Sequence, residues 1–296
     1  MPALMESMDE DFFKAVGAEF LATLLFLFIT ISTAVNGCVT TDNRVPALKS
    51  EPLTDCTLDS GRMLNIALSF GISIFVLVYA AAAYSGGHIN PAVTLGLLLA
   101  NKISVVRALF YMVAQVLGGL VGVAIVKQYN PVSYAAAGGA ANQLFAPTTP
   151  AGGWGMETIL TFCLVWMVLS ATDSERAVDA PHLPILAPLA IGLTVFLAHI
   201  VAIPVTNCCI NPARGFAAAA VSGNWDSQWI WWVGPFSGAI LAVLVYEIAF
   251  RPDFDGIRHR GPGVGLFPGM AGVEGEEKTG AAGDVLPPNA LTGSHL

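Results

Sequence analysis

Six stretches of this chain are too long and too apolar for an ordinary soluble domain. A transmembrane helix needs about 20 apolar residues to cross a hydrocarbon core of ~30 Å. Only 11% of the residues are charged, whereas soluble domains carry about 25%. The stretches therefore predict six transmembrane helices. They run from Ala15 to Val35, between Arg62 and His88, between Arg107 and Lys127, from Trp154 to Thr172, from Pro184 to Ile203, and between Asp226 and Glu247.

The segments outside the spans divide the chain into three parts. We expect a cytoplasmic N-terminal segment at residues 1–14, a membrane domain at 15–250 and a disordered cytoplasmic tail at 251–296. The tail is rich in Gly and Pro and cannot bury enough apolar surface to fold alone. Most Lys and Arg residues outside the spans fall on one side, which places both termini in the cytoplasm. There is no Lys/Arg-rich run, so nucleic acid is excluded as a partner.

Two further apolar segments, Pro91 to Ala100 and Pro212 to Val221, are too short to span a membrane. Segments of this length favour a re-entrant path. Each opens with the same triplet, Asn90-Pro91-Ala92 or Asn211-Pro212-Ala213. Asn is a strong N-cap residue, Pro is favoured at the first helical position, and Ala promotes helix. Each triplet therefore predicts the start of a half-length helix.

The two triplets belong to an internal repeat, with one copy at about residues 15–127 and the other at 154–250. A spacing of 121 residues separates Asn90 from Asn211 and also Gly71 from Gly192. Each copy holds three spans, an odd number, so the second copy crosses the membrane upside down. The two half-helices then begin near the midplane. Each brings about half a unit of positive charge, and together they oppose cations and protons.

Two carboxylates lie inside predicted spans, at matching places in the two repeats. These residues are Glu19 and Glu157. An acid within the membrane is a candidate functional residue, and a proton carrier is one alternative. The re-entrant backbone also needs hydrogen-bond partners. We therefore predict that both acids accept hydrogen bonds from re-entrant N–H groups.

The extended signatures resemble the aquaporin, or major intrinsic protein, family. They read Ser85-Gly86-Gly87-His88-Ile89-Asn90-Pro91-Ala92-Val93-Thr94 and Ile210-Asn211-Pro212-Ala213-Arg214. Three more motifs are similar to the plant-type plasma-membrane intrinsic proteins: Arg107 to Val113, Ser170 to Asp173, and His182 to Pro188. The resemblance implies an all-α fold of six transmembrane helices and two re-entrant half-helices, arranged as inverted three-helix repeats. It also implies a plasma-membrane homotetramer with one pore per subunit and no cofactor.

The resemblance further places the outer constriction of the pore, residue by residue, at Phe70, His199, Cys208 and Arg214. This set is the family's pattern for water-selective members. Gly215 stands where glycerol facilitators carry Asp. His88 is expected to line the inner pore. The implied function is a passive water channel that excludes protons and ions, with hydrogen peroxide left open as a second substrate.

Regulation is expected at the cytoplasmic side. The plant-type group closes through its fourth loop, which matches residues 173–182 here. Histidine changes its charge in the physiological pH range, so protonated His182 is expected to favour closure. Ser104 matches the group's phosphorylated serine, although an unmodified loop serine remains the alternative. The loop departs from the group at Asp179-Ala180-Pro181.

Three other functions remain as alternatives to a water channel. A secondary transporter also uses inverted repeats and broken helices, and a glycerol-type channel would admit broader solutes. An enzyme using Cys208 or Cys209 with His199 would need a third group to orient the base. No carboxylate lies nearby in sequence, so we expect no enzyme activity. The five cysteines lack metal-ligand spacing, so we expect no metal site.

Overall fold

Six long helices form the body of the protein in a computed structural model that describes residues 6–36, 58–174, 177 and 180–250. Each helix is long and apolar enough to cross a membrane, and the described part of the chain holds no strand. The fold class predicted from the sequence is therefore confirmed. The six helices are α1 (Glu10–Asn36), α2 (Ser60–Ser85), α4 (Val105–Tyr129), α6 (Pro150–Ala171), α8 (His182–Thr206) and α10 (Ile230–Val245), the last continued by a π-helical turn, η2 (Tyr246–Phe250).

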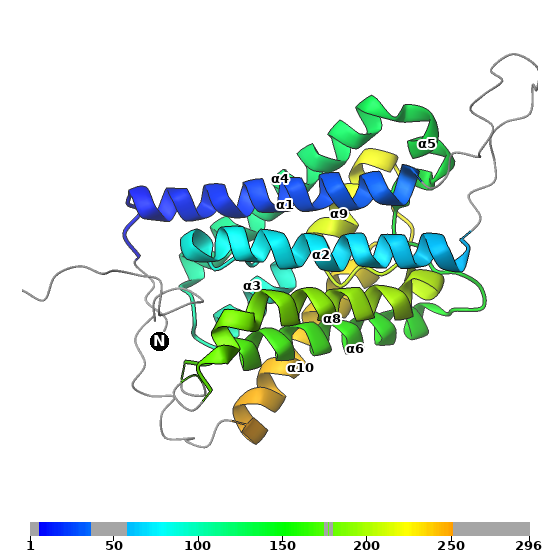
Figure 1. Cartoon of the computed structure of the whole chain (residues 1–296). Helices are drawn as coiled ribbons and strands as arrows, with labels where there is room; N and C mark the ends of the chain where they lie inside the picture. Colours follow the sequence, from blue (N-terminus) through cyan, green and yellow to red (C-terminus); the bar gives the residue numbers. More distant parts are fainter. Residues whose placement is uncertain (1–5, 37–57, 175–176, 178–179, 251–296) are drawn as a thin grey trace, which may run out of the picture.

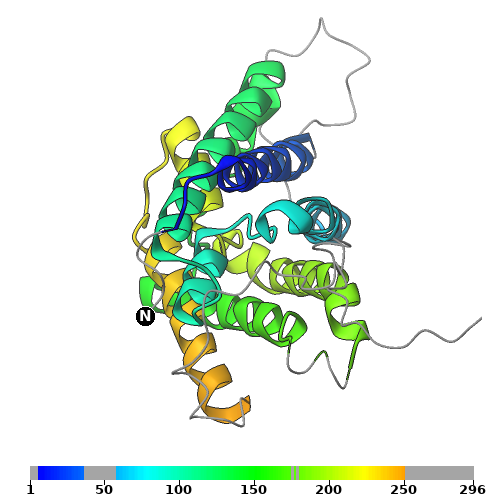
Figure 2. The same ribbon diagram turned by 90° about the vertical axis from the view of Figure 1, so that its left-hand side faces the viewer.

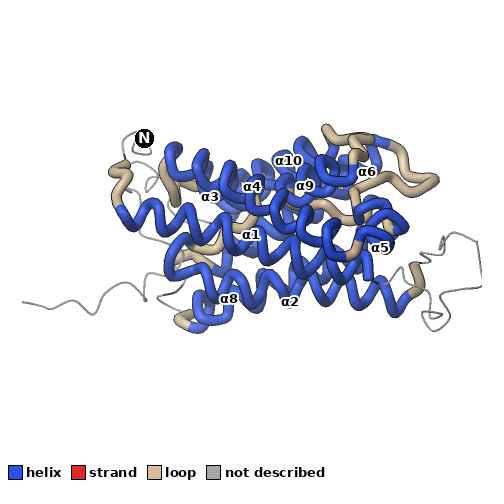
Figure 3. Tube along the Cα trace, turned by 90° about the horizontal axis from the view of Figure 1, so that it is seen from above, coloured by secondary structure: helices blue, strands red, loops and turns tan. Residues whose placement is uncertain are grey.

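Two half-helices, α3 (Pro91–Leu99) and α9 (Pro212–Ser222), lie within the bundle toward its opposite ends (Figure 1, Figure 3). Both begin at the predicted triplets. The side chain of Asn90 caps α3 by accepting from the N–H of Ala92 at 2.8 Å, and Asn211 caps α9 through Ala213 at 3.0 Å. Proline follows each cap at the first helical position, where no N–H partner is needed.

The long helices pack as two equivalent pairs, α1 with α4 and α6 with α10, while α2 packs against α8 between them. Small residues permit these close approaches. A Cβ atom at Gly118 would lie 2.2 Å from the carbonyl oxygen of Phe20, and one at Gly238 would lie 2.3 Å from that of Thr158. Matching contacts in the two halves are what an inverted repeat requires.

The centre of the repeat is the contact between α2 and α8. Here Gly71 and Gly192 face each other, and a Cβ atom at either one would come within 2.8 Å of the other's carbonyl oxygen. Viewed nearly along the helices in Figure 2, the long helices surround the turns that lead into α3 and α9. Because of the repeat, the first residues of both half-helices lie in the middle of the protein.

The connection between α4 and α6 contains two short elements that the sequence did not predict. They are α5 (Pro131–Ala136) and a 3-10 turn, η1 (Gly138–Ala140). The η1 turn contacts α9, so this connection lies over the second half-helix. The tail predicted at 251–296 and residues 175–176 and 178–179 of the fourth loop lie outside the described residues.

Candidate functional site

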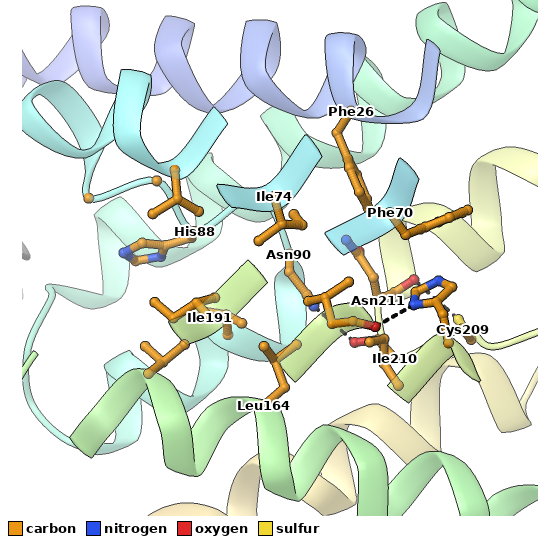
Figure 4. A pocket seen from close by; sticks show the side chains of 17 residues that line it. Phe26, Phe70, Ile74, His88, Asn90, Leu164, Ile191, Cys209, Ile210 and Asn211 are labelled. Atoms are coloured by element: carbon orange, nitrogen blue, oxygen red, sulfur yellow. Dashed lines mark hydrogen bonds between the residues drawn. The ribbon is translucent and has the colours of Figure 1, made fainter. Parts of the chain in front are cut away.

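A cavity lies in the middle of the bundle and extends from His88 to Phe70 (Figure 4). Its wall is mostly apolar, and the polar side chains on it are two asparagines and two histidines. Seven of the lining residues come from the turns that lead into the half-helices, the two capping asparagines included. The lining residues are Phe26, Phe70, Ile74, Val78, Gly86, Gly87, His88, Asn90, Val93, Leu164, Val168, Ile191, Val195, His199, Cys209, Ile210 and Asn211.

The two capping asparagines also link the two repeats. The amide nitrogen of Asn90 donates to the carbonyl oxygen of Ile210 at 2.9 Å, and that of Asn211 donates to the carbonyl oxygen of Ile89 at 2.9 Å. Each amide group carries two N–H hydrogens, so one of them is left over at the cavity wall. The cavity thus offers two hydrogen-bond donors beside two helix N-termini.

Glu19 of α1 is completely buried and supports the turn before α3. Its carboxylate accepts from the backbone N–H groups of His88 at 2.8 Å and Ile89 at 2.7 Å. It also accepts from the hydroxyl of Ser85 at 2.6 Å and the amide of Gln115 at 2.7 Å. Every partner is a donor, so the group acts as a hydrogen-bond acceptor and fixes the backbone of the turn.

Glu157 of α6 does the same in the second repeat. It accepts from the N–H groups of Cys209 at 2.9 Å and Ile210 at 2.6 Å, and from the hydroxyl of Thr206 at 2.7 Å. Ser85 and Thr206 are 121 residues apart, the spacing of the two asparagines. The structure therefore places both predicted acids at the re-entrant backbone, with equivalent partners.

At one end of the cavity the rings of Phe70 and His199 stack, with centroids 4.0 Å apart and planes 27° from parallel. The guanidinium carbon of Arg214 lies 5.9 Å from the centre of the Phe70 ring. Nδ1 of His199 donates to the carbonyl oxygen of Val195 at 2.8 Å, which leaves Nε2 as an acceptor. This Nε2 and Nε of Arg214 are buried and have no partner among the described residues.

Of the four residues expected at the constriction, the structure brings together Phe70, His199 and Arg214. Cys208 is buried in the turn before α9, within the same apolar cluster as Phe70. Of the four residues, Phe70 and His199 line the cavity, whereas Arg214 and Cys208 are absent from its wall. Cys209 contributes to that wall. Its sulfur contacts the carbonyl oxygen of Asn211 at 3.2 Å and that of Trp231 at 3.7 Å, and therefore lies between the start of α9 and α10.

The guanidinium of Arg214 is held by two residues that the sequence analysis missed. Nη1 donates to Oδ1 of Asn142, and Nη2 donates to the carbonyl oxygen of Asn207 at 3.2 Å. Both partners are neutral. Asn142 lies in the irregular segment after η1, and neither a hydrophobic period nor a motif singled it out.

His88 lies at the other end of the cavity, in the turn before α3. Its Nδ1 is 3.1 Å from the hydroxyl of Thr94, which also accepts from the amide of Gln115 at 2.9 Å. The edge of the His88 ring meets the ring of Tyr111, with centroids 5.1 Å apart. These contacts fix the imidazole at the cavity wall.

Ser104 lies near the N-terminal segment and caps α4 by accepting from the N–H of Arg107 at 3.0 Å. Its hydroxyl donates to Glu6, which also pairs with Arg107. Burial raises the pKa of Glu6, but the hydrogen bonds and charge of Arg107 and the bond from Ser104 outweigh it, so the pKa lies below its ordinary value.

His182, the other residue expected to act in gating, is the exposed first residue of α8. The described residues contain no cluster of three metal-binding side chains.

Comparisons with known proteins agree with this geometry. The family model described as "Major intrinsic protein" matches residues 6–246. Aquaporin PIP2-5 of Oryza sativa subsp. japonica is 47% identical over 262 residues, which cover 86% of this chain and 90% of that protein. Aquaporin PIP2-5 of Zea mays is 48% identical over 242 residues, covering 81% and 83% of the two chains. The X-ray structure of the aquaglyceroporin from Plasmodium falciparum superposes with a TM-score of 0.66 at 21% identity, covering 81% and 98% of the chains, and so shares the fold.

Proposed function

Because this chain belongs to the major intrinsic protein family, we propose that it is a passive, water-selective channel of the plasma membrane. The chain is a multi-pass membrane channel and not an enzyme. The proposal that it selects water rests mainly on one observation. A largely apolar cavity joins two inward-facing helix starts to an end where the rings of Phe70 and His199 stack.

The middle of the pore is proposed to bind water through the asparagines and to reject positive charge. The free amide hydrogens of Asn90 and Asn211 donate to a passing oxygen. The positive ends of α3 and α9 meet there, and each carries about half a unit of charge. Half-helix dipoles and a pore arginine are known barriers to protons and cations in aquaporin-type channels.

The end of the cavity at Phe70 and His199 is proposed to be its narrow end and to choose the solute. Phe70 and His199 limit its width, Nε2 of His199 accepts a hydrogen bond, and Arg214 donates one. Because the hydrogen-bond partners of the Arg214 guanidinium are neutral, its positive charge stays available to repel cations. Cys208 completes this set as a small residue on the chain before α9. Hydrogen peroxide resembles water in size and hydrogen bonding, so we include it as a second substrate.

Stopped-flow light scattering of proteoliposomes tests the proposal. Vesicles with the purified protein are expected to shrink much faster than empty vesicles under a sucrose gradient, while glycerol enters both at the same slow rate. Fast glycerol entry would instead support the broader glycerol-type channel. Flux that saturates, or that follows an ion gradient, would support the secondary transporter.

Gating is proposed to involve Ser104 and His182 on the cytoplasmic side. Phosphorylation of Ser104 would replace a hydroxyl that donates to Glu6 with a dianion that repels it. The new charge would also attract Arg107 and favour the N-terminus of α4. The N-terminal segment should therefore detach. Ser104→Glu is expected to change water permeability relative to Ser104→Ala, and equal permeability of the two variants would refute this role.

We also propose a homotetramer with both termini in the cytoplasm. Large apolar side chains cover the outside of the bundle, including Leu117 on α4 and Leu197 on α8, and such a surface needs lipid or another subunit. Native mass measurement in detergent tests the tetramer. Protease protection of tags at the two ends in sealed vesicles tests the orientation.

A further inference from the structure

We propose that Asn142 is a positioning residue that holds the guanidinium of Arg214 at the narrow end of the cavity and thereby sets the selectivity of the channel. This inference rests on the function proposed above. It assigns a role in selection to a residue outside the constriction, on the connection between α4 and α6. That connection joins the two repeats and belongs to neither of them.

The contacts of Asn142 make it a bridge. Its Oδ1 accepts from Nη1 of Arg214. Its amide nitrogen donates to the carbonyl oxygens of Thr206 and Asn207, each at 3.2 Å. Nη2 of Arg214 donates to the same Asn207 carbonyl at 3.2 Å. One buried side chain therefore ties the arginine to the turn that precedes α9.

Asn207, in the turn before α9, also binds the segment that carries Asn142. Its amide nitrogen donates to the carbonyl oxygen of Ala141 at 2.9 Å and to that of Ala140 at 3.4 Å. Asn207 has a left-handed backbone with φ of 58°, a conformation that Asn adopts more readily than most residues. The N–H of Phe145 also donates to the carbonyl oxygen of Val205 at 3.1 Å. The two connections therefore form one unit that fixes Asn142 relative to Arg214.

This arrangement sets which atoms of the arginine remain free. Asn142 and Arg214 are only 3% and 2% exposed, so lost hydrogen bonds are not simply replaced by bulk water. With Nη1 and Nη2 bound, Nε of Arg214 has no partner among the described residues. Removing a hydrogen bond to a charged group shifts a conformational equilibrium roughly tenfold or more. Without Asn142, the guanidinium is expected to leave the constriction for a large fraction of the time.

Two substitutions separate this role from a merely structural one. Both Asn142→Ala and Asn142→Asp remove the amide donor to Thr206 and Asn207, so both weaken the link between the two connections. Only Asn142→Asp keeps an acceptor for Arg214, and it adds a negative charge beside it. If Asn142 only supports the connection, the two variants must behave alike. If it positions Arg214, Asn142→Ala must lose the exclusion of glycerol, whereas Asn142→Asp must keep it and lose the exclusion of cations.

The experiment compares wild type, both variants and the control Asn130→Ala in proteoliposomes, with water, glycerol and sodium flux measured on the same vesicles. The control removes another amide donor from the same connection, which contacts Asn36 at 2.6 Å and is exposed. Asn142→Ala is expected to raise the glycerol-to-water permeability ratio about tenfold. Asn142→Asp is expected to keep the wild-type ratio but to leak sodium. The control should match wild type in all three fluxes.

Equal glycerol-to-water ratios for wild type and Asn142→Ala would overturn the inference, as would identical behaviour of the Ala and Asp variants. If Asn142→Ala fails to insert, Asn142→Asp decides alone. Retained glycerol exclusion with sodium leak supports the role, and absence of the leak overturns it. If the wild type passes water and excludes glycerol and sodium, the variants test this inference separately from the proposed function. A wild type that passes no water refutes the proposed function, and this inference with it.

Discussion

Replacing Glu157 with glutamine tests how the second half-helix is held. The carboxylate accepts from the N–H groups of Cys209 and Ile210 on different oxygens, at 2.9 and 2.6 Å. Glutamine offers one oxygen and one NH₂ group. In either orientation, one backbone N–H therefore faces a donor and loses its acceptor in the buried turn.

The expected magnitude follows from these contacts. A buried donor without a partner costs about 1–3 kcal/mol, and the remaining bonds lose the roughly 1 kcal/mol that a charged acceptor adds. The free energy of unfolding should therefore fall by about 2–4 kcal/mol. For a chain of this size, such a loss corresponds to a fall in Tm of roughly 5–15 °C. The displaced turn should also lower water permeability, because Asn211 follows it directly.

The assay combines thermal unfolding in detergent with stopped-flow water permeability per inserted protein. Glu10→Gln is the control, because Glu10 forms only an exposed pair with Lys14 at 2.8 Å, and exposed pairs contribute little. Glu19→Gln should resemble Glu157→Gln, since Glu19 has equivalent partners. Wild-type Tm and wild-type permeability in Glu157→Gln would refute the reasoning.

Three further predictions concern the pore and its regulation. His199→Gly removes the ring stacked on Phe70 and should raise glycerol permeability roughly tenfold or more, measured by stopped-flow; an unchanged value contradicts the role of His199. Mercurials should block water flux through Cys208, the proposed fourth residue of the constriction, so Cys208→Ser should resist the block. Although Cys209 contributes to the cavity wall, its sulfur contacts the carbonyl oxygens of Asn211 and Trp231, so Cys209→Ser should stay sensitive; identical responses of wild type and Cys208→Ser to mercury would refute this. The lowered pKa of Glu6 means that its pairing is present above the ordinary glutamate pKa and is lost only as pH falls through the lower folded value. Glu6→Gln should therefore leave the midpoint of pH-dependent closure unchanged between about pH 5.5 and 7.5, whereas His182→Ala should abolish closure; a shifted midpoint in the first variant, or wild-type closure in the second, would contradict the assignment.

The elements of the fold were predictable because their signals are local. Span length follows from apolar runs, and the observed α2 (Ser60–Ser85) lies close to the stretch predicted between Arg62 and His88. The half-helices follow from the capping preference of Asn90 and Asn211. The 121-residue spacing indicated the repeat, and the odd number of spans in each copy predicted its inverted arrangement without any three-dimensional information.

The supports of the site were less predictable, because they are contacts between connections far apart in sequence. Asn142 meets Arg214 across 72 residues, and Glu6 meets Arg107 across 101. Neither contact leaves a periodic pattern, and an asparagine in a connection has many other uses. Cys208 and Cys209 are adjacent residues of the same type. The backbone conformation of the turn, which the sequence does not reveal, determines which of the two sulfurs faces the pore.

The central claim is that this pore passes water while rejecting charge at the meeting point of α3 and α9. The most direct test records osmotic shrinkage and internal pH together, in proteoliposomes that contain the purified protein and a pH-sensitive dye. The account predicts rapid shrinkage with no more proton entry than in empty vesicles under an imposed pH gradient. Proton entry that rises with the amount of inserted protein, or shrinkage no faster than that of empty vesicles, would contradict it.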